Sequence, residues 1–199
     1  MREIRALSAA ELREAYEQVM REAFPPQELK PLWAIEKMVE RGEYLPCGLF
    51  DDGLAVGYML LWRDENYVLI DYLCVPKQLR SGGIGGELIA RVISSMPDET
   101  VFIGEVEAPG GDPAENAIRC RRLAFYQRCG ARTLEYETGI FGVHYKTIVW
   151  ARGEIDETEI MRRHAGFYRR NIPARRYADV VQIPLRPGEA VKPFELIRE

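Results

Sequence analysis

A run of glycines follows an apolar segment, and its backbone could bind phosphate. Residues 80–86 have the sequence RSGGIGG, with glycine at four of the last five positions. Where such a turn enters a helix, free backbone N–H groups and the helix dipole favour an anion, and absent side chains let phosphate oxygens come close. Arg80 would add a fixed cation with several hydrogen-bond donors. The alternative is a glycine-rich helix start kept for tight packing.

Acidic residues lie on two predicted strands that are otherwise apolar, which is a costly place for charge. Asp71 is within YVLIDYLCV, and Glu105 and Glu107 are within VFIGEVE. Glu105 and Glu107 are two residues apart, so they are expected on the same face of the strand. Each of the three could act as a general base, directly or through water. Alternatively, one or two of them pair with arginines of the next helix, namely Arg119, Arg121 or Arg122.

Two common phosphate-binding loops fit the glycine run less well. A P-loop would end in Gly-Lys-Ser/Thr, and no lysine is present here. A dinucleotide fingerprint, G-x-G-x-x-G, would place its third glycine at position 88, which is Leu88, and would follow its strand directly. Glu105 does lie about 20 residues further on, as that fingerprint requires. The dinucleotide interpretation therefore stays open.

Hydrophobic periodicity and turn residues predict the elements that must position these groups. An S-x-x-E capping box at Ser8 and Glu11 begins a helix that FPP at 24–26 ends. A second helix ends at Gly42, and a hairpin and the strand at 67–75 follow. Helices are also predicted after the glycines and at 114–129, with strands at VFIGEVE, ARTLEYE and YKTIVWA, the last two joined through TGIFGVH. This order indicates a mixed α/β or α+β fold.

The pattern R-x-x-G-x-G at residues 80–85, after a strand ending LCV-P, resembles the GCN5-related N-acetyltransferase (GNAT) superfamily. The resemblance covers about residues 1–151 and includes the paired N-terminal helices, the hairpin, the long central strand and the helix RLAFYQRCGAR. It implies a twisted, mostly antiparallel central sheet with helices on both faces. It also implies acetyl-CoA as co-substrate and an amine as acetyl acceptor.

The resemblance assigns the cofactor contacts. In that superfamily the amides of the glycine loop bind the pyrophosphate of acetyl-CoA, and the sheet splays beside the central strand so that free backbone groups pair with the pantetheine arm. The corresponding residues here are Leu73, Cys74, Val75, Arg80, Ser81, Gly82, Gly83, Ile84, Gly85 and Gly86.

The resemblance also assigns the chemistry. Acetyl transfer needs a neutral amine and a protonated leaving thiolate, and the superfamily usually needs no covalent nucleophile. Tyr126, in FYQRCG, matches the helix tyrosine that protonates the departing sulfur, because a neutral hydroxyl can donate at pH 7. The alternative for Tyr126 is a half-buried core aromatic. Asp71, Glu105 and Glu107 are the candidate bases, and Cys74 lacks a histidine that would make it a nucleophile.

One position departs from the family pattern. Seven residues before the helix tyrosine, many members have an asparagine that touches the pantetheine arm, and this chain has Arg119. Asn116 is nearby but three residues early. The resemblance therefore does not carry a cofactor contact over to either residue.

Composition narrows the class of protein. The chain has 199 residues, 47% of them hydrophobic and 29% charged, which suits one soluble domain with a core. A net charge of −4 disfavours nucleic-acid binding, and no apolar run approaches the ~18 residues of a membrane span. Four cysteines lack metal-ligand spacing. We expect a cytoplasmic, metal-free monomer or homodimer that acetylates a small cationic amine and binds neither nucleic acid nor membrane.

Residues 152–199 extend beyond the expected end of the acetyltransferase domain at residue 151. Ile160, His164 and Phe167 or Tyr168 share one face of a predicted helix, so we expect this helix to pack on the same domain. The following IPARRYADVVQIPL is expected to be extended and able to add to a sheet edge. The extension is either structural cover or a lid over the acceptor. The competing function for the whole chain is a catalytically inactive CoA-binding sensor or scaffold.

Overall fold

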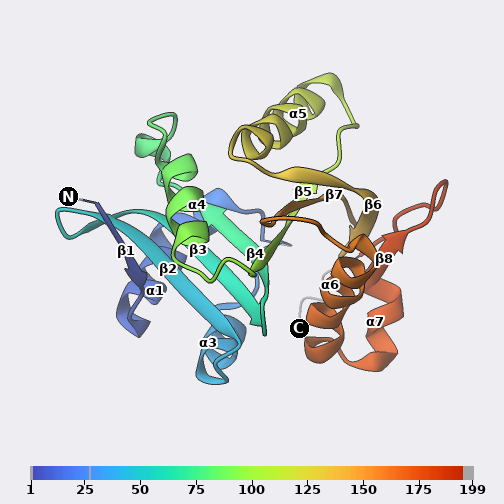
Figure 1. The fold of residues 1–199 in the computed structure, drawn as a ribbon, viewed down its shortest axis with the longest axis horizontal. Helices are drawn as coiled ribbons and strands as arrows, with labels where there is room; N and C mark the ends of the chain where they lie inside the picture. The colour runs from blue at the N-terminus through green and yellow to red at the C-terminus, as the bar shows by residue number, and fades with distance from the viewer. Residues whose placement is uncertain (1, 27, 195–199) are drawn as a thin grey trace. The chain divides into compact units, whose positions relative to one another are not determined.

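The computed structural model describes residues 2–26 and 28–194 of the chain. It divides into two compact units, Met1–Asp98 and Glu99–Glu199, each with its own antiparallel strands and helices (Figure 1). The fold is a mixed α/β fold with mostly antiparallel strands, as the sequence predicts. The expected domain boundary between residues 151 and 152 stays a prediction. The two units reflect how compactly each part of the chain packs, and this does not test where the expected domain ends.

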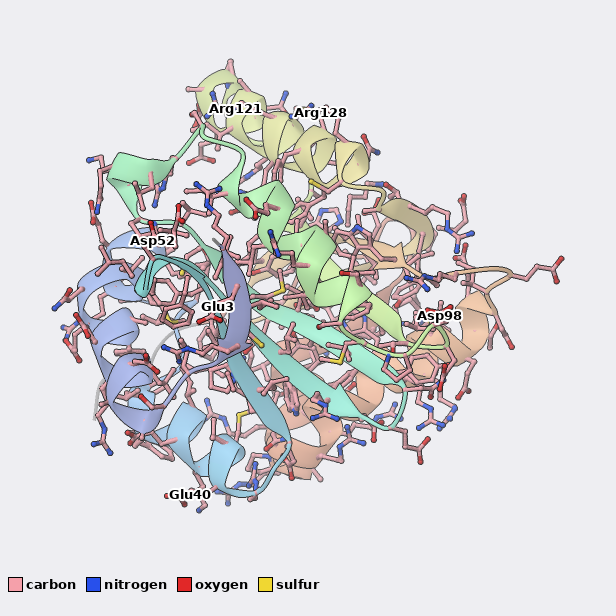
Figure 2. All side chains as sticks on the ribbon, turned by 60° about the vertical axis from the view of Figure 1, so that its left-hand side comes forward. Glu3, Glu40, Asp52, Asp98, Arg121 and Arg128 are labelled. Atoms are coloured by element: carbon pink, nitrogen blue, oxygen red, sulfur yellow. The ribbon has the colours of Figure 1, made fainter. Side chains whose placement is uncertain are left out.

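Four consecutive strands of unit 1 pair with their neighbours in chain order. All three pairs are antiparallel, and the long β3 lies between β2 and β4. Figure 2 labels Glu3 at the start of β1 and Asp52 in the tight turn between β2 and β3. The strands are β1 (Glu3–Ala6), β2 (Tyr44–Asp51), β3 (Leu54–Asp64) and β4 (Tyr67–Cys74).

Helices cover both faces of the unit 1 strands (Figure 1). Ser8 caps the first helix: its side chain accepts from the Glu11 N–H while the Glu11 carboxylate accepts from the Ser8 N–H, as the capping box predicts. That helix continues through a π-helical turn at Tyr16–Met20. The helices are α1 (Ala9–Ala15), α2 (Arg21–Ala23), α3 (Leu32–Glu40) and α4 (Ile84–Ser94).

Helix α4 packs closely on β3 because a glycine faces it. A Cβ at Gly57 would lie 3.1 Å from a methyl carbon of Ile84 and 3.4 Å from one of Leu88. Ile84, Leu88, Ile89 and Val92 are buried, so this face of α4 contributes to the core of unit 1. The close packing fixes where the helix begins, and therefore where the glycine loop lies.

Unit 2 has four further strands in the spatial order β5, β7, β6, β8, all paired antiparallel. The hairpin between β6 and β7 is tighter than expected: most of TGIFGVH continues the strands, and the turn is at Phe141 and Gly142. The elements are β5 (Val101–Glu107), α5 (Pro113–Arg128), β6 (Arg132–Ile140), β7 (Val143–Trp150), α6 (Glu157–Asn171), α7 (Ala174–Val180) and β8 (Val181–Leu185).

The C-terminal extension is only partly as expected. Ile160, His164, Phe167 and Tyr168 of α6 are all buried, as the helical spacing predicts. The expected extended segment was wrong over residues 174–180, which form α7. Pro173 precedes this helix with φ −51°, and backbone N–H groups of the first turn bond back to its carbonyl. Only the last part of the segment is a strand, and β8 pairs with β6.

We predict that Phe167→Ala lowers the free energy of unfolding by about 3–5 kcal/mol, because the ring is fully buried and its loss leaves a cavity. Urea unfolding followed by circular dichroism measures the change. Ile118→Ala is the control: Ile118 is a large apolar residue of the same unit, is 48% exposed, and should change stability by less than about 0.5 kcal/mol. Equal stabilities of the two variants would contradict a packed α6.

Candidate functional site

The glycine loop enters α4 through left-handed backbone. Ser81 and Gly83 have φ values of 67° and 78°. A Cβ at Gly83 would meet no atom within 4 Å, so tight packing does not explain glycine there; its left-handed conformation does. No side chain caps the helix, and the first intrahelical bond from this turn is that of the Glu87 N–H to the Gly83 carbonyl. The N–H groups before it are donors that an anion can bind.

Arg80 is fixed beside this helix start. Its Nε donates to the Val75 carbonyl at 3.1 Å, and its side chain is exposed. The guanidinium therefore spans the turn between β4 and α4. Gly82, Gly83 and Arg80 are all exposed, while Ile84 is buried against β3. The exposed donors and the cation lie on the same short stretch of chain, which suits a phosphate-bearing ligand.

The end of β4 carries the three residues expected to contact the pantetheine arm through their main chains. Leu73 is opposite Met59 and Cys74 opposite Tyr58 in the pairing with β3. Cys74 is buried, and burial raises the pKa of its thiol to about 12. A thiol with that pKa is not a thiolate at neutral pH, which agrees with the expectation that Cys74 is no nucleophile.

Asp71 is an extra residue on β4. Leu60 is opposite Tyr72 and Leu61 is opposite Ile70, so Asp71 has no opposite residue on β3, as in a β-bulge. Both carboxylate oxygens accept from Lys30 Nζ at 2.8 Å, and one also accepts from the Tyr44 hydroxyl. The Asp71 side chain is only 7% exposed. Lys30 precedes α3 and is 41 residues away in sequence, so a single sequence gives no sign of this ion pair.

Glu105 of β5 is bound by the C-terminal helix. Its two carboxylate oxygens lie 2.8 Å from His164 Nε2 and 2.7 Å from the Tyr168 hydroxyl, which donates to it. The other ring nitrogen of His164 lies 3.1 Å from the Tyr136 hydroxyl. Burial raises the pKa of Tyr136, and Glu105 raises it further, so that hydroxyl stays a donor. The sequence expectation placed His164 on a buried face but did not connect it with Glu105.

Glu107 has the arginine partners that the alternative interpretation expects. Arg119 Nε donates to one carboxylate oxygen at 2.8 Å, and Arg122 donates to the other at 2.7 Å. Arg121, the third candidate, is exposed on α5 (Figure 2). Burial alone would raise the pKa of Glu107, but the hydrogen bonds from the two arginines lower it below its usual value. Although Glu105 and Glu107 are two residues apart on the same strand, their partners come from different helices.

Arg119 and Asn116 hold the loop that precedes α5. Arg119 donates to the Gly110 carbonyl at 2.9 Å, and the Asn116 side chain accepts from the Gly110 N–H at 2.8 Å. Asp112 caps the helix by accepting from the N–H groups of Ala114 and Glu115. Arg119, at the position where many members of the family have asparagine, thus has its hydrogen-bond partners within unit 2.

Tyr126 lies on α5 between two aromatic neighbours. Its ring makes edge-on contacts with Phe125 and Trp150, at centroid distances of 5.1 and 5.9 Å. The indole N–H of Trp150 donates to the Cys129 carbonyl at 2.9 Å, which holds that ring in place. The side chain of Tyr126 is half-buried, and burial raises its pKa to about 12. Its hydroxyl is therefore protonated at neutral pH and can donate a proton.

The structure groups the expected site residues within each unit. Unit 1 holds Asp71, the end of β4 and the glycine loop, and unit 2 holds Glu105, Glu107 and Tyr126. Among residues 2–26 and 28–194, no three or more His, Cys, Asp or Glu side chains are placed to hold a metal ion. In that same part of the chain, no helix has the length and apolar character needed to cross a membrane.

The antiparallel pairing of β3 with β4 differs from the parallel sheet of dinucleotide-binding folds. A model of the acetyltransferase (GNAT) family matches residues 9–131, more than half of the chain. A protein of Bacillus subtilis (strain 168) named "Putative acetyltransferase YjbC" is 26% identical over 142 residues. That match covers 70% of this chain and 65% of the Bacillus protein, so it spans less than two thirds of that relative's length.

Two solved structures have a similar fold. A GNAT-family protein from Bacteroides thetaiotaomicron is 20% identical with a TM-score of 0.70, over 86% of this chain and 99% of that one. YncA from Salmonella typhimurium, solved with its cofactor acetyl-CoA, is 16% identical with a TM-score of 0.54, over 78% of this chain and 96% of that one. At these identities the likeness concerns the fold.

We predict that Glu107→Gln lowers the free energy of unfolding by about 2 kcal/mol at pH 7, because two charge-assisted hydrogen bonds are weakened. The folded-state pKa of Glu107 is depressed, so its stabilisation is complete above the ordinary carboxyl pKa of about 4.3 and is lost as the pH falls through the lower folded value. The gap between wild type and variant should therefore close in acid. Urea unfolding at several pH values measures it.

Glu115→Gln is the matched control for this experiment. Its carboxylate also pairs with Arg119, at 3.2 Å, but is 58% exposed, so we expect a change below about 0.5 kcal/mol. A Glu107→Gln gap that widens on acidification would be incompatible with the depressed pKa.

Proposed function

Because the chain belongs to the GNAT family of acetyltransferases, we propose that it transfers an acetyl group from acetyl-CoA to the primary amine of a small cationic molecule. The observation that carries this proposal is the uncapped start of α4. Left-handed backbone at Gly83 leaves N–H groups there exposed to an anion, and the Arg80 guanidinium lies beside them. A pyrophosphate is the ligand that this combination of backbone donors and one guanidinium suits.

Acetyl-CoA would bind along unit 1 through main-chain groups. The N–H groups of the first turn of α4, from Ile84 to Gly86, would bind its pyrophosphate, with Ser81, Gly82 and Gly83 forming the turn before them. The backbone of Leu73, Cys74 and Val75 would pair with the pantetheine arm. Arg80 would add charge without moving, since its Nε is already held by the Val75 carbonyl.

Tyr126 is the proposed general acid. The protonated acceptor amine gives one proton to the general base, and the neutral amine attacks the thioester carbonyl. The carbon–sulfur bond breaks, the nitrogen loses its second proton to water, and the departing thiolate takes a proton from the tyrosine hydroxyl. A hydroxyl whose pKa is raised to about 12 is fully protonated at pH 7, and the resulting tyrosinate would recover a proton from water. No covalent enzyme intermediate is needed, in keeping with a buried, protonated Cys74.

Asp71 and Glu105 are the better candidates for the general base. Both oxygens of Glu107 accept from arginines that lower its pKa, which makes it a weaker base than an ordinary carboxylate. The preference for a cationic acceptor therefore rests on Asp71 and Glu105. Glu105 faces a hydroxyl and an imidazole, while Asp71 already binds an ammonium group, that of Lys30.

We predict that Gly83→Ala weakens acetyl-CoA binding at least about tenfold, a loss of about 1.4 kcal/mol, because a side chain in left-handed backbone disturbs the donors that face the pyrophosphate. Gly42→Ala is a matched control: Gly42 has φ 73° against 78° for Gly83, and both have open space around a Cβ. Calorimetric titration measures affinity. Both variants should lose similar stability, and only Gly83→Ala should lose affinity; equal affinities would contradict the site.

We also predict that Tyr126→Phe lowers kcat about a hundredfold while acetyl-CoA affinity stays close to wild type, because only the proton donor is removed. CoA release against a panel of amines measures the rate. Tyr177→Phe is the control, since Tyr177 is likewise half-buried with a pKa raised by burial but lies on α7. Acetyl-CoA binding without turnover of any amine would instead support the sensor or scaffold function.

A further inference from the structure

The ammonium group of Lys30 is bound by a carboxylate and two aromatic rings of unit 1. Lys30 Nζ lies 2.8 Å from both carboxylate oxygens of Asp71. It lies 5.5 Å from the ring centroid of Trp62 and 5.3 Å from that of Tyr72, within the range of cation–π attraction. Tyr44 donates its hydroxyl proton to the same carboxylate. We call Asp71, Tyr44, Trp62 and Tyr72 the ammonium site.

The ammonium site is built from paired strands. Tyr44 of β2 is directly opposite Trp62 of β3, and both are almost fully buried. In a regular strand Asp71 and Tyr72 would point to opposite faces, yet both contact the same ammonium group, which the irregular register at Asp71 permits. Because the strands hold these four side chains, the site does not need Lys30 in order to form.

Lys30 is held in place by its main chain. Its N–H donates to the Tyr72 hydroxyl at 2.9 Å, and its carbonyl accepts from the Tyr16 hydroxyl at 3.1 Å. The Tyr72 hydroxyl in turn donates to the Glu28 carbonyl at 2.9 Å. The Lys30 side chain is 26% exposed, against 7% for Asp71. Its ammonium group can therefore be exchanged with another from solvent while the backbone stays anchored.

The chemistry of the site specifies its ligand class. A carboxylate supplies charge-assisted hydrogen bonds to an ammonium group, and aromatic faces favour a cation on an aliphatic stem. We propose that the ammonium site binds the primary ammonium group of the acetyl acceptor, and that Lys30 occupies it until an acceptor displaces it. This inference rests on the proposed amine acetyltransfer, and it specifies the acceptor as a primary amine on an unbranched alkyl chain.

A permanent structural ion pair is the alternative explanation, and the two differ in a measurable way. If Lys30 competes for the site, the apparent affinity for an external ammonium ligand is reduced by the fraction of protein in which the site is open. Removal of the Lys30 side chain then increases affinity. If the pair is only structural, its removal costs stability and leaves KM for the acceptor unchanged, even where an alkylammonium ion fills the space that Lys30 vacates.

The binding test uses the full chain without CoA, with n-butylammonium as the probe because it reproduces the end of a lysine side chain. Calorimetry should show Lys30→Ala binding the probe about tenfold more tightly than wild type. n-Butanol, which has the same shape and no charge, should not bind. Lys37→Ala removes an exposed lysine of α3 and should match wild type. Lys30→Ala combined with Asp71→Asn should lose the gain.

A kinetic test separates this inference from the proposed function. In the CoA-release assay, Lys30→Ala should lower KM for primary alkylamines relative to Lys37→Ala. An unchanged or higher KM with turnover intact overturns the inference and leaves acetyl transfer standing. Butylammonium binding that fails to increase in Lys30→Ala, or persists in the double variant, overturns it as well. Tight ammonium binding without turnover of any amine supports the ammonium site and contradicts the proposed function.

A second variant covers the possibility that Lys30→Ala does not fold. Lys30→Met keeps an unbranched side chain and removes the charge, and the bonds to Tyr72 and Tyr16 involve only the main chain at this position. We expect the same direction of change in affinity and KM, with a smaller size, because the thioether chain still fills part of the site. Thermal unfolding of both variants identifies the one to use.

Discussion

Three carboxylates lie on strands whose other side chains are mostly apolar, and each must be compensated because water reaches it poorly. The compensation comes from a different element each time. Lys30, before α3, binds Asp71; His164 and Tyr168 of α6 bind Glu105; Arg119 and Arg122 of α5 bind Glu107. The positions of these three elements within their units are therefore tied to charges on the strands as well as to apolar packing.

The partners that compensate the charge of each carboxylate determine which chemistry that carboxylate can perform. Hydrogen bonds from two guanidinium groups lower the pKa of Glu107 although burial would raise it, so Glu107 is stabilised as an anion. Glu105 accepts from a hydroxyl and contacts an imidazole. Asp71 contacts a single ammonium group on a flexible stem, which another ammonium group can replace more easily than it could a pair of guanidinium groups. The three carboxylates therefore differ in the chemistry that they can perform, and this difference comes from their partners.

Local patterns were sufficient for most of the fold. The capping box at Ser8 and the approximate positions of most strands follow from spacing over a few residues, and the buried face of α6 follows from helical periodicity. The helix at 174–180 was missed, although Pro173 directly before it is a residue that suits a helix start. The glycine loop was recognisable because left-handed backbone and an exposed helix start favour glycine, which is visible in the sequence. Partners such as Lys30 of Asp71, 41 residues away, leave none.

The C-terminal extension shows why structural cover and control of the site need not be separate roles. His164 is fully buried and contacts Glu105 across 59 residues of sequence, while Tyr136 contacts its other ring nitrogen. Removing α6 would leave a carboxylate on β5 without these partners, and an uncompensated buried charge costs more than the bonds that it loses. The helix that covers the core of unit 2 is thus also the source of the hydrogen bonds that fix a candidate base. A deletion of the extension would therefore change stability and the chemistry of Glu105 together, so only single substitutions at the polar contacts can separate them.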